Sequence, residues 1–384
     1  MMKSVKNIVD KNLNSTNTNQ SSIDHKKYWT FKRIGSKKSP EFLLDGKKVN
    51  NKTLKTRIKS IYIPPAYKNV AIAKSLNNPI QVMGTDIKGR RQYLYSSKHI
   101  KRQEEQKYKN VLSLGNIIIK LEEDNDKDIK HLANILHSKP DKFNKPSDFM
   151  PIVIYMLRTY HFRIGNEKYT DDNNSYGITT LCKNHIKFKQ NSNKFIIEFT
   201  GKKGVENKVE DDNKYMYFIL KKLCEMAKGK DGYIFSYITE NTGNSTIITP
   251  EHVQQYLNDR YTCNNNSNNN NNSNNNSNKC DITPKMFRTW YANFHLLTYL
   301  RDEYKKGNLS SNITLKDLKQ VIKSCCEYVS NKLNNTPSIS KKSYIDNKIF
   351  DVILKDPVKY VKHIPNDNSG IHKYLFKTIK QMRD

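Results

Sequence analysis

The sequence contains no run of about 18 consecutive apolar residues, the minimum for a membrane-spanning helix. Residues 1–20 are polar and have no apolar core of the kind that marks a signal peptide. We therefore expect a protein that works inside the cell and does not bind membranes. The six cysteines form no CxxC pair and show no zinc-like spacing with histidine, so we expect reduced thiols and no metal site.

Acidic residues are also scarce. Asp and Glu number 37 against 67 Lys and Arg, which gives a formal net charge of +30. Charge of one sign along a whole chain opposes compact folding, so a polyanionic partner is expected. Nucleic acid is the first candidate, because its phosphates bind lysine and arginine with release of counterions. The alternative is a lysine-rich soluble protein without such a partner.

Apolar residues make up only 36% of the 384 residues, and two segments are particularly polar. Residues 1–25 are rich in Asn, Ser, Thr and Lys and have no Phe, Tyr or Trp, while residues 264–278 contain only Asn and Ser. Such segments cannot bury enough surface to fold, so we expect a disordered tail and a disordered insert. The rest of the chain is long enough for two domains.

Residues 26–98 are predicted to form the first domain, which is β-rich because short alternating runs are separated by turn signals. In its last strand, one face carries Arg91, Tyr93 and Tyr95, and the other carries Arg90 and Gln92. Tyrosine beside arginine and glutamine can stack on bases, bind phosphate and read base edges. The alternative is an ordinary edge strand with a solvated basic face.

Helical patterns dominate the second domain. Ser97 is expected to cap a long charged helix that runs toward Leu121 and joins the two domains. Ser147 is expected to cap a buried helix over residues 148–162, with Gly165 as a suitable end. Together the patterns predict an α+β protein, with a small β-rich N-terminal domain over residues 26–98 and a larger, mostly α-helical domain over residues 99–384.

Strands interrupt the helices once, and two helices follow them. Alternation predicts strands over residues 186–188, 195–200 and 205–209, with Lys202 at the tip of a hairpin. Thr283 and Pro284 are typical of a helix start, and Arg288 then lies near the end that favours phosphate. The next helix runs from about Thr314 to Leu333, with these apolar residues facing inward: Leu315, Leu318, Val321, Ile322, Cys325, Val329 and Leu333.

The stretch over residues 334–344 places Tyr344 among lysines directly behind that helix, and Tyr344 is our candidate nucleophile. A phenol with a pKa of about 10 attacks a phosphodiester poorly unless cations and hydrogen-bond donors stabilise the charge on phosphorus. Arg163, Lys202 and Arg288 are candidates for that role. Taken singly, each has an ordinary interpretation: a helix-end cation, a solvated turn and a surface arginine.

Their order along the chain adds a family resemblance. Five segments resemble the poxvirus-like type IB DNA topoisomerases, which include small viral and bacterial enzymes: Arg-Ile-Gly-Asn-Glu-Lys-Tyr (163–169), Ser-Tyr-Gly-Ile-Thr-Thr-Leu (175–181), the Gly-Lys hairpin (201–204), Lys-Met-Phe-Arg-Thr-Trp (285–290) and Thr-Pro-Ser-Ile-Ser-Lys-Lys-Ser-Tyr (336–344). Residues 84–95 resemble the small N-terminal domain of that family. The resemblance covers about residues 60–350 and excludes the tail and the insert.

The resemblance implies a catalytic domain of the type IB topoisomerase and tyrosine recombinase fold. It implies that Tyr344 attacks a DNA phosphodiester to form a 3′-phosphotyrosyl link, that the 5′-hydroxyl end rotates to release supercoils, and that this hydroxyl then reseals the strand. Arg163 and Arg288 would bind the non-bridging oxygens, and Lys202 would protonate the leaving oxygen. No ATP, metal or other cofactor is expected.

The resemblance also implies a partner and a set of contacts. Double-stranded DNA would be the substrate, held by a monomer that clamps the duplex, in a virion or viral factory if the source is a large DNA virus. The DNA contacts carried over from the family are Lys168, Tyr169 and Lys285 in the large domain and Arg90, Gln92, Tyr93 and Tyr95 in the small one.

Two positions depart from the family pattern. Asn335 stands where the family usually has histidine, and Asn166 stands where poxvirus enzymes are expected to have a lysine near the bases. An amide can donate a hydrogen bond to phosphate but carries no charge. We therefore expect a working site with transition-state stabilisation lower by about 1–2 kcal/mol, and no carried-over preference for a pyrimidine-rich cleavage sequence.

Two alternatives from other classes stay open. A tyrosine recombinase shares the catalytic fold and the Arg, Lys, Arg, Tyr set but assembles four subunits; the β-rich lobe that ends in residues 84–95 favours a topoisomerase. An inactive DNA-binding or packaging protein would bind duplex with salt sensitivity and form no covalent adduct.

Overall fold

The structure is a computed structural model, and it describes residues 24–35, 40–139, 143–167, 170, 174–228, 232–239, 245–261 and 282–384. Two compact units make up the chain, Met1–Lys107 and Tyr108–Asp384. Nearly all of the predicted tail and the whole Asn/Ser insert lie outside the described residues. Within the described residues, no helix is both long and apolar enough to cross a membrane.

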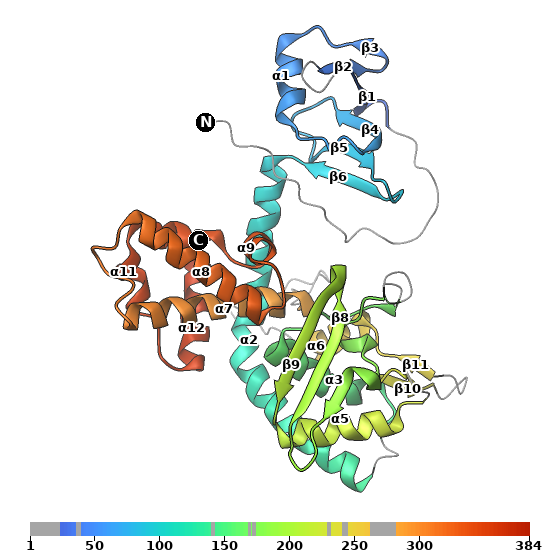
Figure 1. Cartoon of the computed structure of the whole chain (residues 1–384), viewed down its shortest axis with the longest axis vertical. Coiled ribbons are helices and arrows are strands. Elements are labelled where there is room, and N and C mark those ends of the chain that lie inside the picture. Colours follow the sequence, from blue (N-terminus) through green and yellow to red (C-terminus); the bar gives the residue numbers. More distant parts are fainter. Residues whose placement is uncertain are drawn as a thin grey trace, which may run out of the picture. The chain divides into compact units, whose positions relative to one another are not determined.

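The first unit is built on an antiparallel sheet of six strands in the order β3-β2-β1-β4-β5-β6 (Figure 1). The strands are β1 (Tyr28–Gly35), β2 (Pro40–Leu44), β3 (Lys47–Lys48), β4 (Lys68–Ala73), β5 (Ile80–Thr85) and β6 (Arg91–Tyr95). Their inward side chains, such as Ile72, Val82 and Leu94, form a small core of their own. The β-rich character predicted for this part of the chain is confirmed.

One helix of the first unit, α1 (Lys52–Ser60), was not predicted. Asn51 caps it, because the Asn51 side chain accepts a hydrogen bond from the Leu54 amide at 2.9 Å. Ile58, only 2% exposed, fixes the helix on the core of the sheet. The helix is short and has only two apolar side chains, Leu54 and Ile58, so the sequence gives little sign of it.

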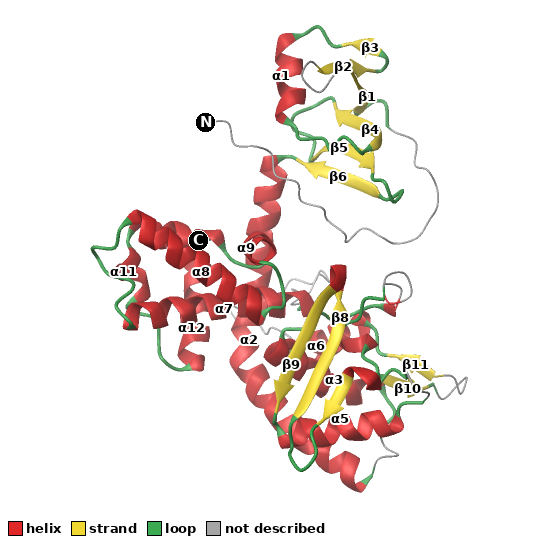
Figure 2. Cartoon of the chain, in the orientation of Figure 1, coloured by secondary structure: helices red, strands yellow, loops and turns green. Residues whose placement is uncertain are grey.

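The second unit is mostly helical, as predicted (Figure 2). Its helices are α2 (Ser97–Ser138, which begins in the first unit), α3 (Pro146–Tyr155), η2 (Met156–Tyr160), η3 (Ile178–Thr180), η4 (Lys183–His185), η5 (Lys202–Gly204), α5 (Lys214–Met226), α6 (Pro250–Arg260), α7 (Pro284–Lys305), α8 (Leu315–Lys332), α9 (Pro337–Ser343), α10 (Asn347–Lys355), α11 (Pro357–Val361) and α12 (Asn368–Gln381). Its strands are β7 (Ile186–Phe188), β8 (Phe195–Gly201), β9 (Val205–Asp211), β10 (Ser236–Ile238) and β11 (Ser245–Ile247).

A single large core unites this unit, and α7 lies at its centre. Trp290 and Phe287 on α7 are completely buried, and α7 packs against α8 and α12. On the other side of the unit, β7, β8 and β9 form an antiparallel sheet against which α5 packs. The strand and hairpin predictions for residues 186–209 are confirmed, with β8 and β9 slightly longer than expected.

The two predicted helices at the start of this unit differ in extent from the expectation. α2 begins at Ser97, but the predicted Ser97 cap is wrong by one residue: Ser96 caps the helix, because its Oγ accepts the His99 amide at 3.2 Å. The helix then continues to Ser138, because buried residues recur at helical spacing well beyond Leu121. The next helix begins at Pro146 rather than after a Ser147 cap, since Asp148 accepts the backbone N–H of Lys145 at 2.8 Å.

That helix also ends earlier than predicted. Its last turn, η2, is a π-turn, and His161 then adopts the left-handed conformation with φ of 55°, so the helix stops four positions before Gly165. The later helices start where predicted, α7 after Thr283 and α8 after Thr314. Leu315 was expected to face inward, but it is 58% exposed because it stands in the first turn, before the buried Leu318.

The cysteines that the structure describes are free thiols, as predicted: Cys182, Cys224, Cys325 and Cys326. Cys263 and Cys280 lie outside the described residues.

Candidate active site

Tyr344 directly follows the short helix α9 and is only 7% exposed. The chain leaves α8 through Asn334, which has a φ of 48°, and Thr336 then caps α9 by accepting the Ile339 amide at 3.3 Å. At the other end, the amides of Tyr344 and the next residue both donate to the Ser340 carbonyl at 3.0 Å. A turn, a cap and a pair of helix-end hydrogen bonds therefore fix the backbone that leads into the tyrosine.

Two arginines from other elements contact the Tyr344 side chain. Arg163, three residues after η2, places its Nη2 atom 3.4 Å from the phenol oxygen. Arg288 on α7 has its guanidinium carbon 5.1 Å from the centre of the Tyr344 ring. The same Arg163 Nη2 donates to Asn335 Oδ1 at 2.9 Å. The structure thus brings together four of the predicted catalytic residues from three distant segments.

Arg288 is held by backbone carbonyls in a buried position. It is 3% exposed, and its two terminal nitrogens donate to the carbonyl oxygens of His161 and Leu333, the latter at 2.6 Å. Burial lowers the pKa of Arg288 to about 10, with the Tyr344 phenol opposing the change, so the guanidinium stays charged at neutral pH. The left-handed turn at His161 aims its carbonyl at Arg288, and neither this turn nor the burial was predicted.

The electrostatics of the phenol are unusual for a buried tyrosine. Burial alone would raise the pKa of Tyr344, but the charges of Arg288 and Arg163, a hydrogen bond to Arg288 and the charge of Lys285 outweigh it and lower the pKa to about 8. Lys285 lies in the first turn of α7. The site therefore stabilises the phenolate, which is the nucleophilic form, relative to that of an ordinary tyrosine.

Asn335 combines a satisfied oxygen with an unsatisfied nitrogen. Its Oδ1 accepts from Arg163, and its backbone amide donates to Ser330 at 3.0 Å. Its Nδ2 is buried and has no hydrogen-bond partner among the described residues. A buried donor without a partner costs about 1–3 kcal/mol, so an oxygen of a bound anion would relieve a real penalty at this position.

Lys202 differs from these four residues, because it is exposed. It begins η5, the turn that joins β8 to β9 (Figure 2). Lys203 and Gly204 both have left-handed φ values, 66° and 74°, which shape this tight connection. The hairpin presents the lysine to solvent at the end of two long paired strands.

A glycine contact positions Arg163 and was missed by the sequence reasoning. The Arg163 carbonyl accepts the amide of Ile178 at 2.9 Å, in the turn that contains the Ser-Tyr-Gly segment. A Cβ atom on Gly177 would lie 2.5 Å from the Gly165 nitrogen and 2.7 Å from the Arg163 carbonyl oxygen. Only glycine allows these two backbone segments to lie so close. The sequence feature that could have predicted this contact is the pair of glycines, Gly165 and Gly177, in neighbouring motifs.

The predicted DNA contacts of the first unit are divided between two faces of β6. Tyr93 and Tyr95 are partly exposed, with ring centres 6.4 Å apart. Gln92 lies on the other face, 8% exposed, and its Nε2 donates to Asp86 at 3.0 Å. Arg90 also binds Asp86, through Nη2 at 2.7 Å. The predicted alternation is confirmed, but the acid that holds two of these residues was not anticipated.

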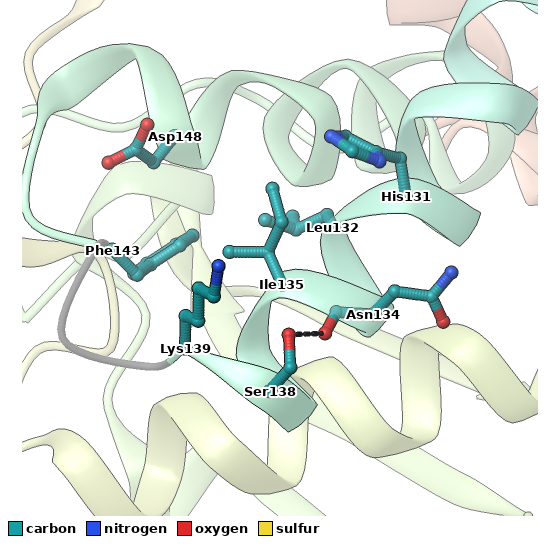
Figure 3. A pocket seen from close by; sticks show the side chains of 8 residues that line it. All are labelled: His131, Leu132, Asn134, Ile135, Ser138, Lys139, Phe143 and Asp148. Carbon is teal, nitrogen blue, oxygen red and sulfur yellow. Dashed lines mark hydrogen bonds between the residues drawn. The ribbon is translucent and has the colours of Figure 1, made fainter.

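Two other predicted contacts, Lys168 and Tyr169, lie outside the described residues. A cavity of about 390 Å³ lies at the end of α2 (Figure 3), with Asp148 from α3 also lining it. None of the predicted site residues lines it. Within the described residues, no cluster of His, Cys, Asp and Glu side chains is arranged to hold a metal ion.

Comparison with known proteins identifies the family. Residues 96–364 match the family described as "Eukaryotic DNA topoisomerase I, catalytic core". The chain belongs to the type IB DNA topoisomerases. Residues 42–86 separately match "Bacterial DNA topoisomerase IB, N-terminal domain", in the part of the chain that forms most of the six-stranded sheet.

Individual relatives agree with this assignment. The chain is 29% identical over 330 residues to DNA topoisomerase 1B of Acanthamoeba polyphaga mimivirus, covering 85% of this chain and 87% of that protein. It is 25% identical to DNA topoisomerase 1 of Rabbit fibroma virus (strain Kasza), over 78% of this chain and 81% of that protein. With DNA topoisomerase 1B of Vaccinia virus (strain Copenhagen) the identity is 23%, over 71% of each chain.

The predicted family, the α+β fold and the predicted activity are therefore confirmed. This topoisomerase relaxes DNA, and DNA is the polyanion that its basic composition indicated. The match over the catalytic core favours a topoisomerase over the tyrosine recombinase and over a DNA-binding protein without activity.

Proposed function

We propose that Tyr344 is the nucleophile of this topoisomerase and that it relaxes supercoiled DNA without ATP or a metal ion. The observation that supports this most directly is the buried phenol beside two arginines, with a pKa lowered to about 8. Its Oη atom forms a bond to phosphorus as the bond from phosphorus to the 5′-oxygen breaks. The product is a 3′-phosphotyrosyl link and a free 5′-hydroxyl, which rotates and later attacks to reverse the step.

Arg163 and Arg288 stabilise the charge on the two non-bridging oxygens. Arg288 is held by two carbonyls before substrate binds, so its orientation costs little during the reaction. Arg163 is partly exposed and its hydrogen bond to the phenol is long, 3.4 Å, which leaves it able to turn toward a phosphate. Removing one such donor typically raises the barrier by about 2.7–4 kcal/mol.

Asn335 takes the place of the usual histidine in this proposal. Its unpaired Nδ2 donates to a non-bridging oxygen, while its Oδ1 keeps the contact to Arg163. Because the amide is neutral, the hydrogen bond is weaker than one from a protonated histidine. Arg163 and Asn335 are already paired before substrate binds, so each restricts the orientation of the other.

Lys202 acts as the general acid. It gives its proton to the departing 5′-oxygen, and its place on an exposed hairpin tip allows it to reach DNA that binds there. The remaining predicted residues contact DNA without taking part in the bond exchange: Arg90, Gln92, Tyr93, Tyr95, Lys168, Tyr169 and Lys285.

We further propose that residues 26–98 and 99–384 are the functional domains, that both contribute DNA contacts, and that the enzyme works as a monomer. The separate match of residues 42–86 to an N-terminal domain supports the division. If the source of the chain is a large DNA virus, for which the viral relatives named above are the support, we propose that the enzyme works in the virion or the viral factory.

Trapping the covalent complex on a suicide duplex tests the central assignment. In such a duplex the short 5′-hydroxyl strand diffuses away after cleavage, so the protein stays attached to the DNA. Peptide mapping should find Tyr344 joined to a 3′-phosphate, and Tyr344→Phe should form no adduct. An adduct on another tyrosine, a link to a 5′-phosphate, or relaxation by Tyr344→Phe would overturn the proposal.

A further inference from the structure

The backbone on the C-terminal side of Tyr344 is held by a buried group of side chains that has no contact with the phenol itself. The Tyr344 carbonyl accepts two hydrogen bonds, from Tyr108 Oη at 3.1 Å and from Asn293 Nδ2 at 2.9 Å. Asn293 Oδ1 accepts the amide of Asp346 at 2.8 Å. Both Tyr108 and Asn293 are completely buried, so the peptide after the tyrosine has little freedom to move.

Arg383, two residues after α12, completes this group from the far end of the sequence. Its guanidinium carbon lies 4.4 Å from the centre of the Tyr108 ring, and its Nη2 lies 2.6 Å from Asp346 Oδ2. Both charged side chains are only 2% exposed. Nearby, Lys348 Nζ donates to the Met382 carbonyl at 2.8 Å. Arg383 thus contacts one residue that holds Tyr344 and one that follows it.

A buried ion pair of this kind is poorly explained by stability alone. Removing two charges from water costs several kcal/mol per ion, and well-packed apolar residues often stabilise such a site equally well. The pair instead fixes orientation. The planar guanidinium contacts the Asp346 carboxylate and the face of the Tyr108 ring at the same time, so it holds these two groups in one arrangement. The elements it joins are α2, through Tyr108, and the segment between α9 and α10, through Asp346.

We propose that Arg383 is a positioning residue for the nucleophile. It fixes the Tyr108 ring and the Asp346 carboxylate, these fix the peptide after Tyr344, and the phenol is thereby kept between Arg163 and Arg288. Small displacements of a reacting group cost large factors in rate, so the effect should appear in the cleavage step. The inference rests on the proposed role of Tyr344 as nucleophile.

Single-turnover cleavage of a suicide duplex at saturating DNA tests it. Arg383→Met should lower the cleavage rate constant about tenfold, and Tyr108→Phe, which removes only the hydroxyl, should lower it roughly two- to tenfold. The DNA concentration for half-maximal cleavage should stay unchanged in both. The double variant, with Arg383→Met and Tyr108→Phe together, should cleave no more slowly than Arg383→Met alone, because both substitutions break the same chain of contacts to the Tyr344 peptide. Arg383→Lys, which keeps the charge opposite Asp346, should recover part of the rate.

A second substrate separates positioning from proton transfer. A duplex with sulfur in place of the bridging 5′-oxygen has a leaving group that needs no general acid, so it should restore cleavage by Lys202→Ala but not by Arg383→Met or Tyr108→Phe. Arg301→Met is the matched control. Arg301 also binds carbonyls close to α12, those of Pro365 and Asn366, without contacting residues 344–346, and its loss should leave the rate constant unchanged.

The outcomes distinguish the two proposals. If Tyr344→Phe abolishes the adduct but Arg383→Met and Tyr108→Phe cleave at the wild-type rate, only the positioning role is wrong. Additive losses in the double variant, recovery of Arg383→Met on the sulfur substrate, or an equal loss in Arg301→Met would also overturn it. Cleavage by Tyr344→Phe would instead remove the nucleophile assignment on which the inference depends. All variants are compared at a temperature where circular dichroism shows them folded.

Discussion

At the scale of single residues, the Tyr344 phenol experiences two opposing effects. Burial disfavours the phenolate, and the arginine charges favour it more strongly. The sign follows from the charges: a lowered pKa means that the nucleophilic form becomes populated as the pH rises through about 8, rather than through the ordinary value of about 10.

A spectroscopic titration of the free enzyme checks this. The difference in phenolate absorbance between wild type and Tyr344→Phe should show one tyrosine that ionises near pH 8. Arg288→Gln should shift that step to higher pH, because it removes the largest of the effects that lower the pKa. A midpoint that does not change in Arg288→Gln would show that this arginine does not govern the phenol.

Asn335 gives a second prediction at this scale. Asn335→Ala removes the unpaired Nδ2 and should slow single-turnover cleavage about tenfold, the equivalent of about 1.4 kcal/mol. Asn335→His should accelerate cleavage at a pH where the imidazole is protonated, by about 1–2 kcal/mol of transition-state stabilisation. The adjacent Asn334→Ala is not a suitable control because Asn334 has a positive φ, whereas Ser338→Ala changes an exposed position nearby. If Asn335→Ala cleaves as fast as wild type, Asn335 has no role in catalysis.

At the scale of elements, the sequence patterns predicted regular structure well and irregular structure poorly. Thr283 and Thr314, as expected helix caps, predicted the starts of α7 and α8. The alternation of side chains along the chain predicted β8 and β9. The π-turn η2, which ends at the left-handed His161, has no comparable signal in the sequence. It nevertheless aims a carbonyl at Arg288.

In the candidate site, residues that belong to family motifs were predicted and residues outside such motifs were not. Arg163, Arg288 and Tyr344 belong to short motifs whose order identifies the family, so they were found without knowing the fold. Tyr108 belongs to no such motif, and 236 positions separate it from the carbonyl that it binds. Asp86 was missed for a different reason: a turn acid beside basic residues looks like an ordinary solvated group until its hydrogen bonds are known.

The close backbone contact at Gly177 predicts that a larger residue there lowers stability and displaces Arg163. Gly177 has an extended backbone, so Gly177→Ala costs nothing in φ, but its Cβ would overlap the backbone of residues 163–165. We expect a loss of about 1–3 kcal/mol in the free energy of unfolding, together with slower cleavage through displacement of Arg163. Gly307→Ala is the control, because it meets no atom within 4 Å and its cost is only that of a φ of 80°.

Denaturant unfolding and single-turnover cleavage, measured on both variants, separate the two effects. Slower cleavage confined to Gly177→Ala would show that the turn positions Arg163. Equal rates in the two variants would show that the close glycine contact serves folding alone.

At the scale of the whole molecule, the charge of +30 acts on DNA affinity, whereas the buried site acts on the chemical step. Lysines and arginines that bind phosphates release counterions, so affinity for duplex should fall steeply with salt. The groups around Tyr344 are mostly buried, and charges shielded from solvent are screened little by salt. The two quantities should therefore respond differently.

Raising salt from about 50 to about 200 mM should weaken duplex binding by about 10³–10⁵ if 6–10 phosphates are contacted. Binding is measured with Tyr344→Phe, which keeps the formal charge and cannot form an adduct. The cleavage rate constant of the wild type at saturating DNA should change by less than about twofold over the same range, because Arg288 and Tyr344 are buried and salt screens buried charges little. A rate constant that falls in parallel with affinity would mean that the reacting groups are assembled only by screened surface charges, contrary to the buried arrangement of Arg288 and Tyr344.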